Sequence, residues 1–116
     1  MKAVFMELPA FARHRTTYLD DESFRDLQIA LMRNPLAGDV IRGCGGLRKL
    51  RFSDCRRNKG KRGGIRIIYY WHSLANAFWL FAIYDKDEMA DLTELQRQQL
   101  AEVLRHEINQ RQDDEA

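Results

Sequence analysis

The chain has 116 residues, of which 45% are hydrophobic and 31% are charged, and its formal net charge is +2. This length predicts a single domain over residues 1–116, and the hydrophobic fraction excludes an intrinsically disordered chain. The longest apolar run (residues 77–84) is too short to span a membrane. The two cysteines are too few for a disulfide framework, and the cysteines and three histidines lack the spacing of a metal site. We therefore expect a cytoplasmic protein without metal or cofactor.

The first third of the chain predicts one strand and two helices. Residues 3–6 are apolar and indicate a short strand, and Pro9 suits the first turn of the helix that follows. Residues 20–22 supply capping and negatively charged side chains for a second helix, which Asn34 and Pro35 end. The apolar stripe of this second helix consists of Phe24, Leu27 and Leu31, with Ile29 and Met32 nearby.

The middle of the chain predicts strands. Residues 39–41 and 47–52 indicate two short strands around a glycine cluster, and residues 65–72 indicate a central strand because both of its faces are largely apolar. After a turn at 73–76, residues 77–84 alternate as its antiparallel hairpin partner. The alternation predicts that two sets of side chains lie on opposite faces of this strand. One set is Phe78, Leu80, Ala82 and Tyr84, and the other is Ala77, Trp79, Phe81 and Ile83.

The last part of the chain predicts a helix. Asp91 or Thr93 would cap it, leucines at helical spacing give it an apolar stripe, and we expect residues 110–116 to fray. The whole pattern predicts an α+β fold, in which two N-terminal helices pack on a twisted antiparallel sheet and a C-terminal helix closes it.

The small net charge hides a strong asymmetry. Residues 42–66 hold ten basic residues and one acid, a net charge of +9, while the remaining nine basic and sixteen acidic residues give −7. Such a run is often only a solvated surface. This run is interrupted by glycines, which let a ligand approach the backbone, and it leads directly into an apolar strand, so we predict that it binds RNA or DNA. The substrate-binding residues that we assign to it are Arg48, Lys49, Arg51 and Arg62.

Arg66 is the most informative single residue, because a guanidinium within an apolar strand requires an anionic partner or access to solvent. A structural ion pair with a carboxylate at position 85, 87 or 88 is one reading. The other is a planar donor fork aimed at a scissile phosphate, whose charge increases in the transition state.

Further residues can complete such a site. Cleavage by a 2′-hydroxyl needs a base and an acid. A lysine crowded by other cations loses its proton more easily, so Lys59 or Lys61 can act as the base, although both can equally serve only to bind phosphates. Antiparallel pairing brings Tyr84 and Lys86 near Arg66. Aromatic residues within the strands (Tyr69, Trp71 and Trp79) are expected in the core instead.

Three motifs together resemble a known family. They are GLRKLR at residues 46–51, GKRGGIRIIYY at 60–70 and YDKDEMADLT at 84–93. Nearly the whole chain is similar to the RelE/HigB-type toxins of type II toxin-antitoxin systems, and most similar to a HigB subgroup. The resemblance implies the RelE-like microbial RNase fold and metal-independent cleavage of mRNA in the ribosomal A site. It also implies inhibition by a cognate helix-turn-helix antitoxin.

By position, the resemblance implies four catalytic residues: Lys59, Lys61, Arg66 and Lys86. Where classical members carry an arginine implicated as the acid, this chain has Asp87, and it retains Lys86 directly before it. Classical members also carry a C-terminal tyrosine near the site. Here no tyrosine follows Tyr84, so either Tyr84 or His72 is left to contact the substrate in its place.

Three functions therefore compete. The first is a ribosome-dependent mRNA endonuclease. The second is a basic RNA- or ribosome-binding protein that blocks translation without cutting RNA, and the aspartate at position 87 favours it modestly. The third, a DNA-binding corepressor, is weaker because no predicted helix carries the basic residues that groove reading requires.

Overall fold

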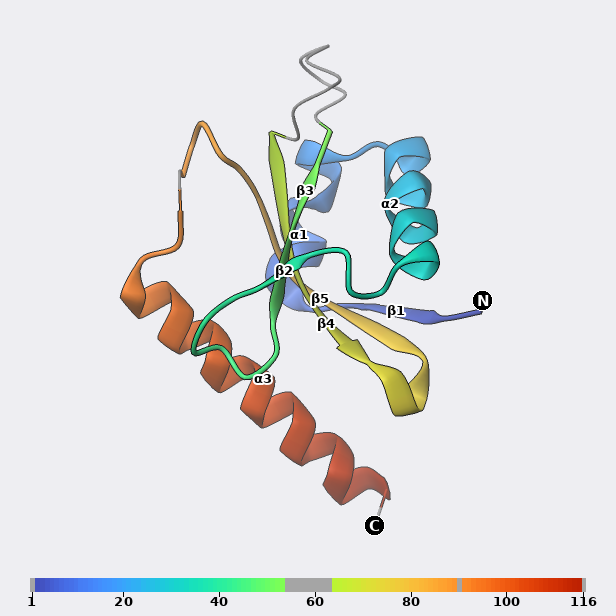
Figure 1. Ribbon diagram of the computed structural model, residues 1–116, viewed down its shortest axis with the longest axis vertical. Helices are drawn as coiled ribbons and strands as arrows, with labels where there is room; N and C mark the ends of the chain where they lie inside the picture. Colours follow the sequence, from blue (N-terminus) through green and yellow to red (C-terminus); the bar gives the residue numbers. More distant parts are fainter. Residues whose placement is uncertain (1, 54–63, 90, 116) are drawn as a thin grey trace.

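The computed structural model of the protein describes residues 2–53, 64–89 and 91–115. The described elements form a five-stranded sheet with helices on both faces, as Figure 1 shows. In chain order they are β1 (Val4–Glu7), α1 (Pro9–Tyr18), α2 (Asp21–Arg33), β2 (Asp39–Val40), β3 (Arg48–Phe52), β4 (Ile65–His72), the 3₁₀ helix η2 (Ser73–Ala75), β5 (Ala77–Asp85) and α3 (Glu94–Glu115). The predicted α+β class is confirmed.

The sheet is mixed, with the strand order β1-β5-β4-β3-β2, so β4 lies at its centre as its two apolar faces predict. Strands β2 to β5 pair antiparallel, but β1 runs parallel to β5, with Val4 opposite Ala77 and Glu7 opposite Leu80. The prediction of a purely antiparallel sheet is wrong at this edge. A four-residue apolar run indicates a buried strand but carries no information about its direction.

Strand β5 contains a β-bulge. Ile68 of β4 pairs with Ala82, whereas the next residue, Tyr69, pairs with Leu80, so Phe81 is one residue more than β4 can match. An extra residue reverses which face the following side chains occupy. The prediction of uninterrupted alternation over residues 77–84 is therefore wrong beyond Phe81.

The bulge moves Tyr84 to the other face of the sheet. Tyr84 belongs to the same buried cluster as Trp79 and Phe81, and Ile83 belongs to the cluster of Phe78. Without the extra residue, Tyr84 would share a face with Phe78, as the sequence pattern predicts. The bulge thus determines which side chains Tyr84 can reach.

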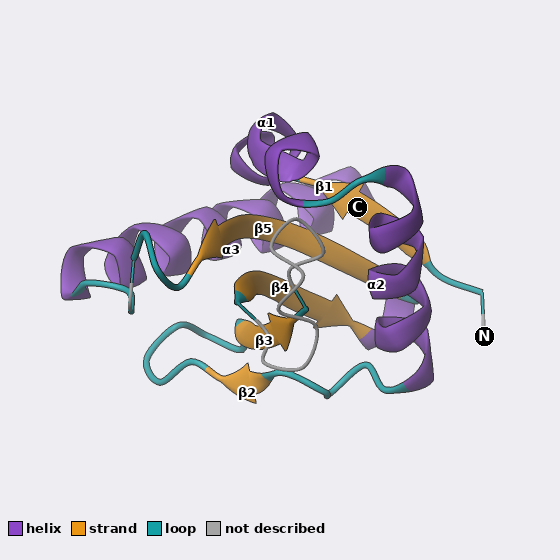
Figure 2. Ribbon diagram, turned by 90° about the horizontal axis from the view of Figure 1, so that it is seen from above, coloured by secondary structure: helices purple, strands orange, loops and turns teal. Residues whose placement is uncertain are grey.

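Each face of the sheet has its own core, and Figure 2 shows the helices that cover the two faces. We call them the α1/α2 face and the α3 face. The core of the α1/α2 face consists of Phe11, Tyr18, Leu19, Leu27, Leu31, Ile65, Ile67, Tyr69, Phe78, Leu80 and Ile83. The core of the α3 face consists of Leu8, Ile41, Cys44, Leu47, Ile68, Ala77, Trp79, Phe81, Tyr84, Leu92 and Leu104. Tyr69 and Trp79 are buried, as predicted.

Local signals in the sequence fix the helix ends. The Asp20 side chain accepts a hydrogen bond from Ser23 N (2.7 Å) and caps α2. At the start of α3, Thr93 Oγ1 accepts from Gln96 N (3.1 Å) and Gln96 Oε1 accepts from Thr93 N (2.8 Å), so Thr93 is the cap. Helix α3 continues to Glu115, beyond residue 110, from which the sequence predicts fraying.

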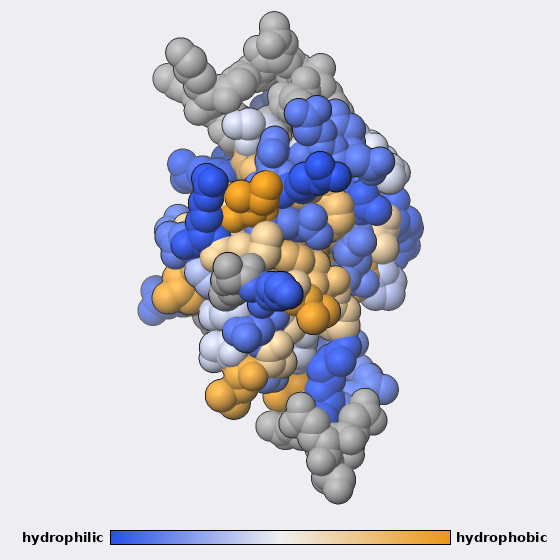
Figure 3. Space-filling model, turned by 90° about the vertical axis from the view of Figure 1, so that its right-hand side faces the viewer, coloured by the Kyte–Doolittle hydropathy of each residue, from blue (hydrophilic) through white to orange (hydrophobic). Residues whose placement is uncertain are grey.

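The surface combines polar and apolar regions. On the side shown in Figure 3, hydrophobic residues gather in the middle of the face with hydrophilic ones around them. Val4 of the edge strand β1 is 63% exposed. No helix of the described ranges has both the length and the hydropathy needed to cross a bilayer.

Tyr69 holds the connection between α2 and β2 against the sheet. Its hydroxyl donates to Pro35 O (2.8 Å) and accepts from Gly38 N (3.0 Å). Arg48, which pairs with Tyr69 across β3 and β4, donates from its guanidinium to Gly38 O (2.8 Å). Burial raises the pKa of the Tyr69 phenol, so the hydroxyl keeps its proton and remains a donor.

Replacing Tyr69 by Phe leaves Gly38 N and Pro35 O without this partner. We expect the free energy of unfolding, measured with denaturant, to fall by about 1–3 kcal/mol. Tyr70→Phe is the matched control, because Tyr70 is a half-buried residue of the same strand that faces the other side of the sheet and makes no side-chain hydrogen bond with the described residues. Equal losses for both variants would contradict this role of Tyr69.

Candidate functional site

Three polar side chains form a row across the centre of the sheet. Arg51 of β3 pairs with Arg66 of β4, and Arg66 pairs with Tyr84 of β5. Directly opposite residues on neighbouring strands project from the same face. Tyr84 belongs to the α3-face core, so all three side chains lie on the α3 face. We call these residues the Arg66 row.

Two like charges stand directly opposite each other in this row. The Arg66 side chain is partly buried and donates from Nη1 to Ile65 O (3.3 Å), while Arg51 is exposed. Like charges at opposite positions of a sheet repel each other. Neither guanidinium can lose its proton, so a bound anion would lower this repulsion. The arrangement is therefore suited to a phosphate.

Tyr84 adds a hydrogen-bond donor beside the two arginines. Its hydroxyl is buried and has no hydrogen-bond partner among the described residues. Burial raises the pKa of the Tyr84 phenol, the Asp91 carboxylate raises it further, and the Arg66 guanidinium opposes both effects. The hydroxyl is therefore protonated at neutral pH and lies within electrostatic reach of Arg66 and Asp91.

The carboxylates that follow Tyr84 are directed elsewhere. Asp85 pairs with Ile65, so its side chain lies on the α1/α2 face, where it is fully buried and accepts from Asp87 N (2.8 Å). Glu88 Oε2 accepts from the hydroxyl of Tyr18 in α1 (3.0 Å). Asp85 and Glu88 thus serve the turn after β5 and its contact with α1.

Lys86 extends the pairing of β4 and β5 by one step. Its backbone N–H donates to Gly64 O (2.9 Å), which places Lys86 two residues along from the pair of Arg66 and Tyr84. The Lys86 side chain is exposed. The prediction that Tyr84 and Lys86 lie near Arg66 agrees with this pairing.

A shared carboxylate connects the sheet to α3. Lys49, on the same face as Arg51, lies 3.3 Å from Asp91 Oδ1, and Arg97 of α3 lies 3.5 Å from Asp91 Oδ2. The backbone N–H of Leu92 lowers the pKa of Asp91 most, and Lys49 and Arg97 lower it further. The sequence did not indicate Arg97, and it indicated Asp91 only as a helix cap, because no motif marks the ion pair between these two residues.

Arg48 is not brought to the Arg66 row. It pairs with Tyr69 and lies on the α1/α2 face, where it bonds Gly38 O and Leu36 O. The period-two pattern of the sequence contains this information, because Arg48 has the same parity as the apolar Leu50. Among the predicted substrate-binding residues of β3, only Lys49 and Arg51 face α3.

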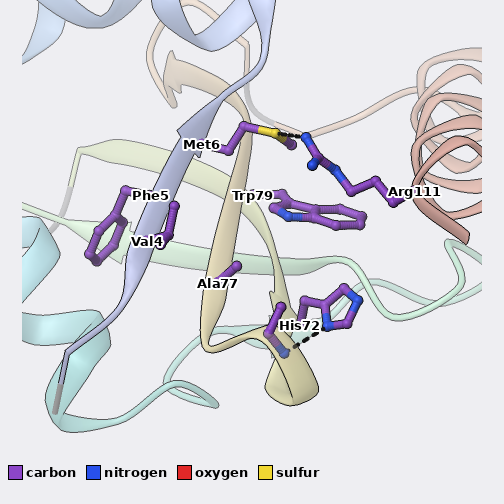
Figure 4. Close-up of a pocket in the computed structure, with 8 residues that line it drawn as sticks. Val4, Phe5, Met6, His72, Ala77, Trp79 and Arg111 are labelled. Carbon is purple, nitrogen blue, oxygen red and sulfur yellow. Dashed lines mark hydrogen bonds between the residues drawn. The ribbon is translucent and has the colours of Figure 1, made fainter. Parts of the chain in front are cut away.

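His72 lies at the other end of β4, six residues from Arg66 and therefore about 20 Å away along the strand. Its Nδ1 accepts from Ala75 N (3.3 Å) and caps η2. Figure 4 shows His72 in a separate cavity of about 490 Å³, with Trp79 and with Arg111 of α3. The structure thus separates His72 from the Arg66 row.

Lys59, Lys61 and Arg62 lie outside the described residues, so their relation to Arg66 stays a prediction. The described chain ends at Ser53, just after β3, and resumes at Gly64, just before β4. Both points are at the end of the sheet that carries the Arg66 row.

The chain matches no family model. Its fold is similar to that of the isolated RelE toxin of E. coli, at 14% identity over 88% of this chain and 99% of the other, with a TM-score of 0.50. A free-state structure of E. coli RelE with two arginines replaced by alanine gives 14% identity over 78% and 90% of the two chains, with a TM-score of 0.49. The first likeness establishes a RelE-like fold.

Replacing Tyr84 by Phe removes a buried hydroxyl that has no partner among the described residues. We expect the free energy of unfolding to rise by about 1 kcal/mol, because the cost of burying that hydroxyl disappears. Denaturant unfolding of the purified variant beside the unchanged protein measures the difference. A clear fall in stability would show that the hydroxyl is bonded within the protein and is not reserved for a ligand.

Proposed function

We propose that this protein is a ribosome-dependent mRNA endonuclease, a RelE/HigB-type toxin that inhibits translation by cutting mRNA in the ribosomal A site. The observation that carries the proposal is the Arg66 row, in which two guanidinium groups and a protonated phenol share one face of the sheet. The fold supports it, because a RelE-like sheet presents this row. The sequence motifs at residues 46–51, 60–70 and 84–93 support the HigB subgroup.

In this mechanism the row binds the scissile phosphate. The 2′-oxygen attacks phosphorus and the bond to the 5′-oxygen breaks, which leaves a 2′,3′-cyclic phosphate and a 5′-hydroxyl end. Negative charge increases on the non-bridging oxygens during this step, and the Arg66 fork donates to them. Arg51 and Lys49 bind the neighbouring backbone.

Residues around the Arg66 row carry out the two proton transfers, one from the 2′-hydroxyl and one to the leaving 5′-oxygen. Lys59 or Lys61 accepts the proton of the 2′-hydroxyl, and Arg62 contacts the substrate beside them. Lys86 or Tyr84 returns a proton to the 5′-oxygen. Of the two residues available to replace the tyrosine of classical members, Tyr84 is favoured over His72, because Tyr84 is the cross-strand partner of Arg66. No metal takes part in this scheme.

The ribosome supplies orientation to a site of weak acids and bases, which accounts for the dependence on translation. A cognate helix-turn-helix antitoxin neutralises the toxin in the cytoplasm, and the positive charge of residues 42–66 favours an acidic antitoxin segment.

A second function is favoured by one observation. Position 87 carries an exposed aspartate where classical relatives carry an arginine implicated as the acid. A chain that binds RNA through the Arg66 row but lacks an effective acid would block translation without cutting the message.

Primer extension on mRNA from cells that express the protein distinguishes the two functions. We expect new 5′ ends within translated codons, and none when translation is blocked by an initiation inhibitor. Arrested translation with intact mRNA would contradict the endonuclease and support the binding protein.

Replacing Arg66 by Gln should reduce cleavage by at least about 100-fold, since it removes a charged donor to the transition state. Arg25→Gln is the matched control, because Arg25 is exposed on α2 and faces away from the α3 face. Circular dichroism checks that both variants fold. Full cleavage by a folded Arg66→Gln protein would show that Arg66 is only structural.

A further inference from the structure

A second cationic cavity lies where α3 meets the loop between β2 and β3, seen side by side in Figure 1. Its volume is about 280 Å³. The loop contributes Arg42 and Gly43. The helix contributes one stripe at helical spacing, formed by Glu94, Arg97, Gln98, Ala101, Glu102 and Arg105.

The loop that forms one wall is held firmly in place. Ile41 N donates to Leu47 O (2.9 Å), and the buried thiol of Cys44 donates to Arg97 O of α3 (3.6 Å). Burial raises the pKa of the Cys44 thiol, so it stays a neutral contact. Gly43 has a φ of 78°, a backbone conformation that favours glycine, and a Cβ at this position would meet nothing within 4 Å. The cavity is thus preformed and open beside Gly43.

The charges of the cavity are suited to a nucleotide. Three arginines, Arg42, Arg97 and Arg105, line it together with two carboxylates. Arg97 Nε is buried without a hydrogen-bond partner among the described residues, although its Nη2 lies 3.5 Å from Asp91. The Arg97 side chain as a whole is 36% exposed and lines the cavity, so the rest of its guanidinium can donate to a ligand there.

The cavity is linked to the Arg66 row by side chains already described. Arg97 and Lys49 share the carboxylate of Asp91, and Lys49 lies on the same face of β3 as Arg51. Cationic groups therefore follow one another from the centre of the sheet to the loop at Arg42.

We propose that this cavity binds a backbone phosphate of the same single-stranded RNA that occupies the Arg66 row. The proposal rests on the RNA-binding part of the proposed function. Arg42 and Arg105 donate to the phosphate, and Glu94 and Glu102 accept from ribose hydroxyls or base amino groups. An acidic peptide fits less well, because its carboxylates offer Glu94 and Glu102 no hydrogen-bond donor, whereas RNA carries ribose hydroxyls beside its phosphate.

The salt dependence of RNA binding tests this site. Fluorescence anisotropy with a labelled RNA of roughly 12 nucleotides, long enough for one strand-binding site, gives the dissociation constant at several salt concentrations. The double variant Arg42→Gln with Arg105→Gln should lower the slope of log K against log salt by about 0.7, since both arginines bind one phosphate and each phosphate contact contributes about 0.7 for single strands. The variant Arg25→Gln with Arg33→Gln removes the same charge from α2 and should leave the slope unchanged.

The outcomes separate this inference from the proposed function. An unchanged slope in the Arg42 and Arg105 variant, or an equal loss in the α2 control, overturns the cavity as an RNA site. If the Arg42 and Arg105 variant binds a polyglutamate peptide more weakly but binds RNA as tightly as the unchanged protein, the RNA site is overturned in favour of an acidic partner. A lowered slope in a protein whose primer extension shows no cleavage supports the cavity and contradicts only the endonuclease.

Discussion

Two arginines stand directly opposite each other at the centre of the sheet, and the interpretation of the site depends on this pair. Arg51 and Arg66 are cross-strand partners on the α3 face, and both carry a guanidinium. A protein selected only for stability would place an opposite charge or an apolar residue in one of these positions, because like charges there repel. The pair is best explained by an anionic ligand, and the neighbouring phenol of Tyr84 supplies the neutral donor that a phosphate also accepts.

The bulge at Phe81 is the structural feature that assembles this group. Before the bulge, β5 presents Phe78 and Leu80 to the α1/α2 face, and beyond it the same parity presents Tyr84 to α3. One additional residue therefore converts a core position into a site position, without any change in the strand that carries Arg66. Bulges are common next to functional sites, where they redirect the side chains that follow them.

Much of the fold could be predicted because its signals are local. Strand β4 has the bounds that its residue pattern predicts, and the caps at Asp20 and Thr93 lie where their side chains can bond nearby N–H groups. The direction of β1 and the bulge in β5 depend on pairing between distant segments, which periodicity does not encode.

The same distinction between local and long-range contacts applies to the candidate site. The closeness of Tyr84 to Arg66 follows from a hairpin, whereas the bridge from Lys49 through Asp91 joins residues 42 positions apart.

Arg51 and Arg66 stand opposite each other as like charges, and a bound anion lowers the repulsion between them. A double-mutant cycle of Arg51→Gln and Arg66→Gln, with unfolding measured in the presence and absence of an RNA of roughly 12 nucleotides, isolates the coupling between the two residues. The account predicts a repulsive coupling of about 0.2–1 kcal/mol in the free protein that disappears or changes sign when RNA is bound. A coupling that is absent in the free protein, or that is the same with and without RNA, would contradict it.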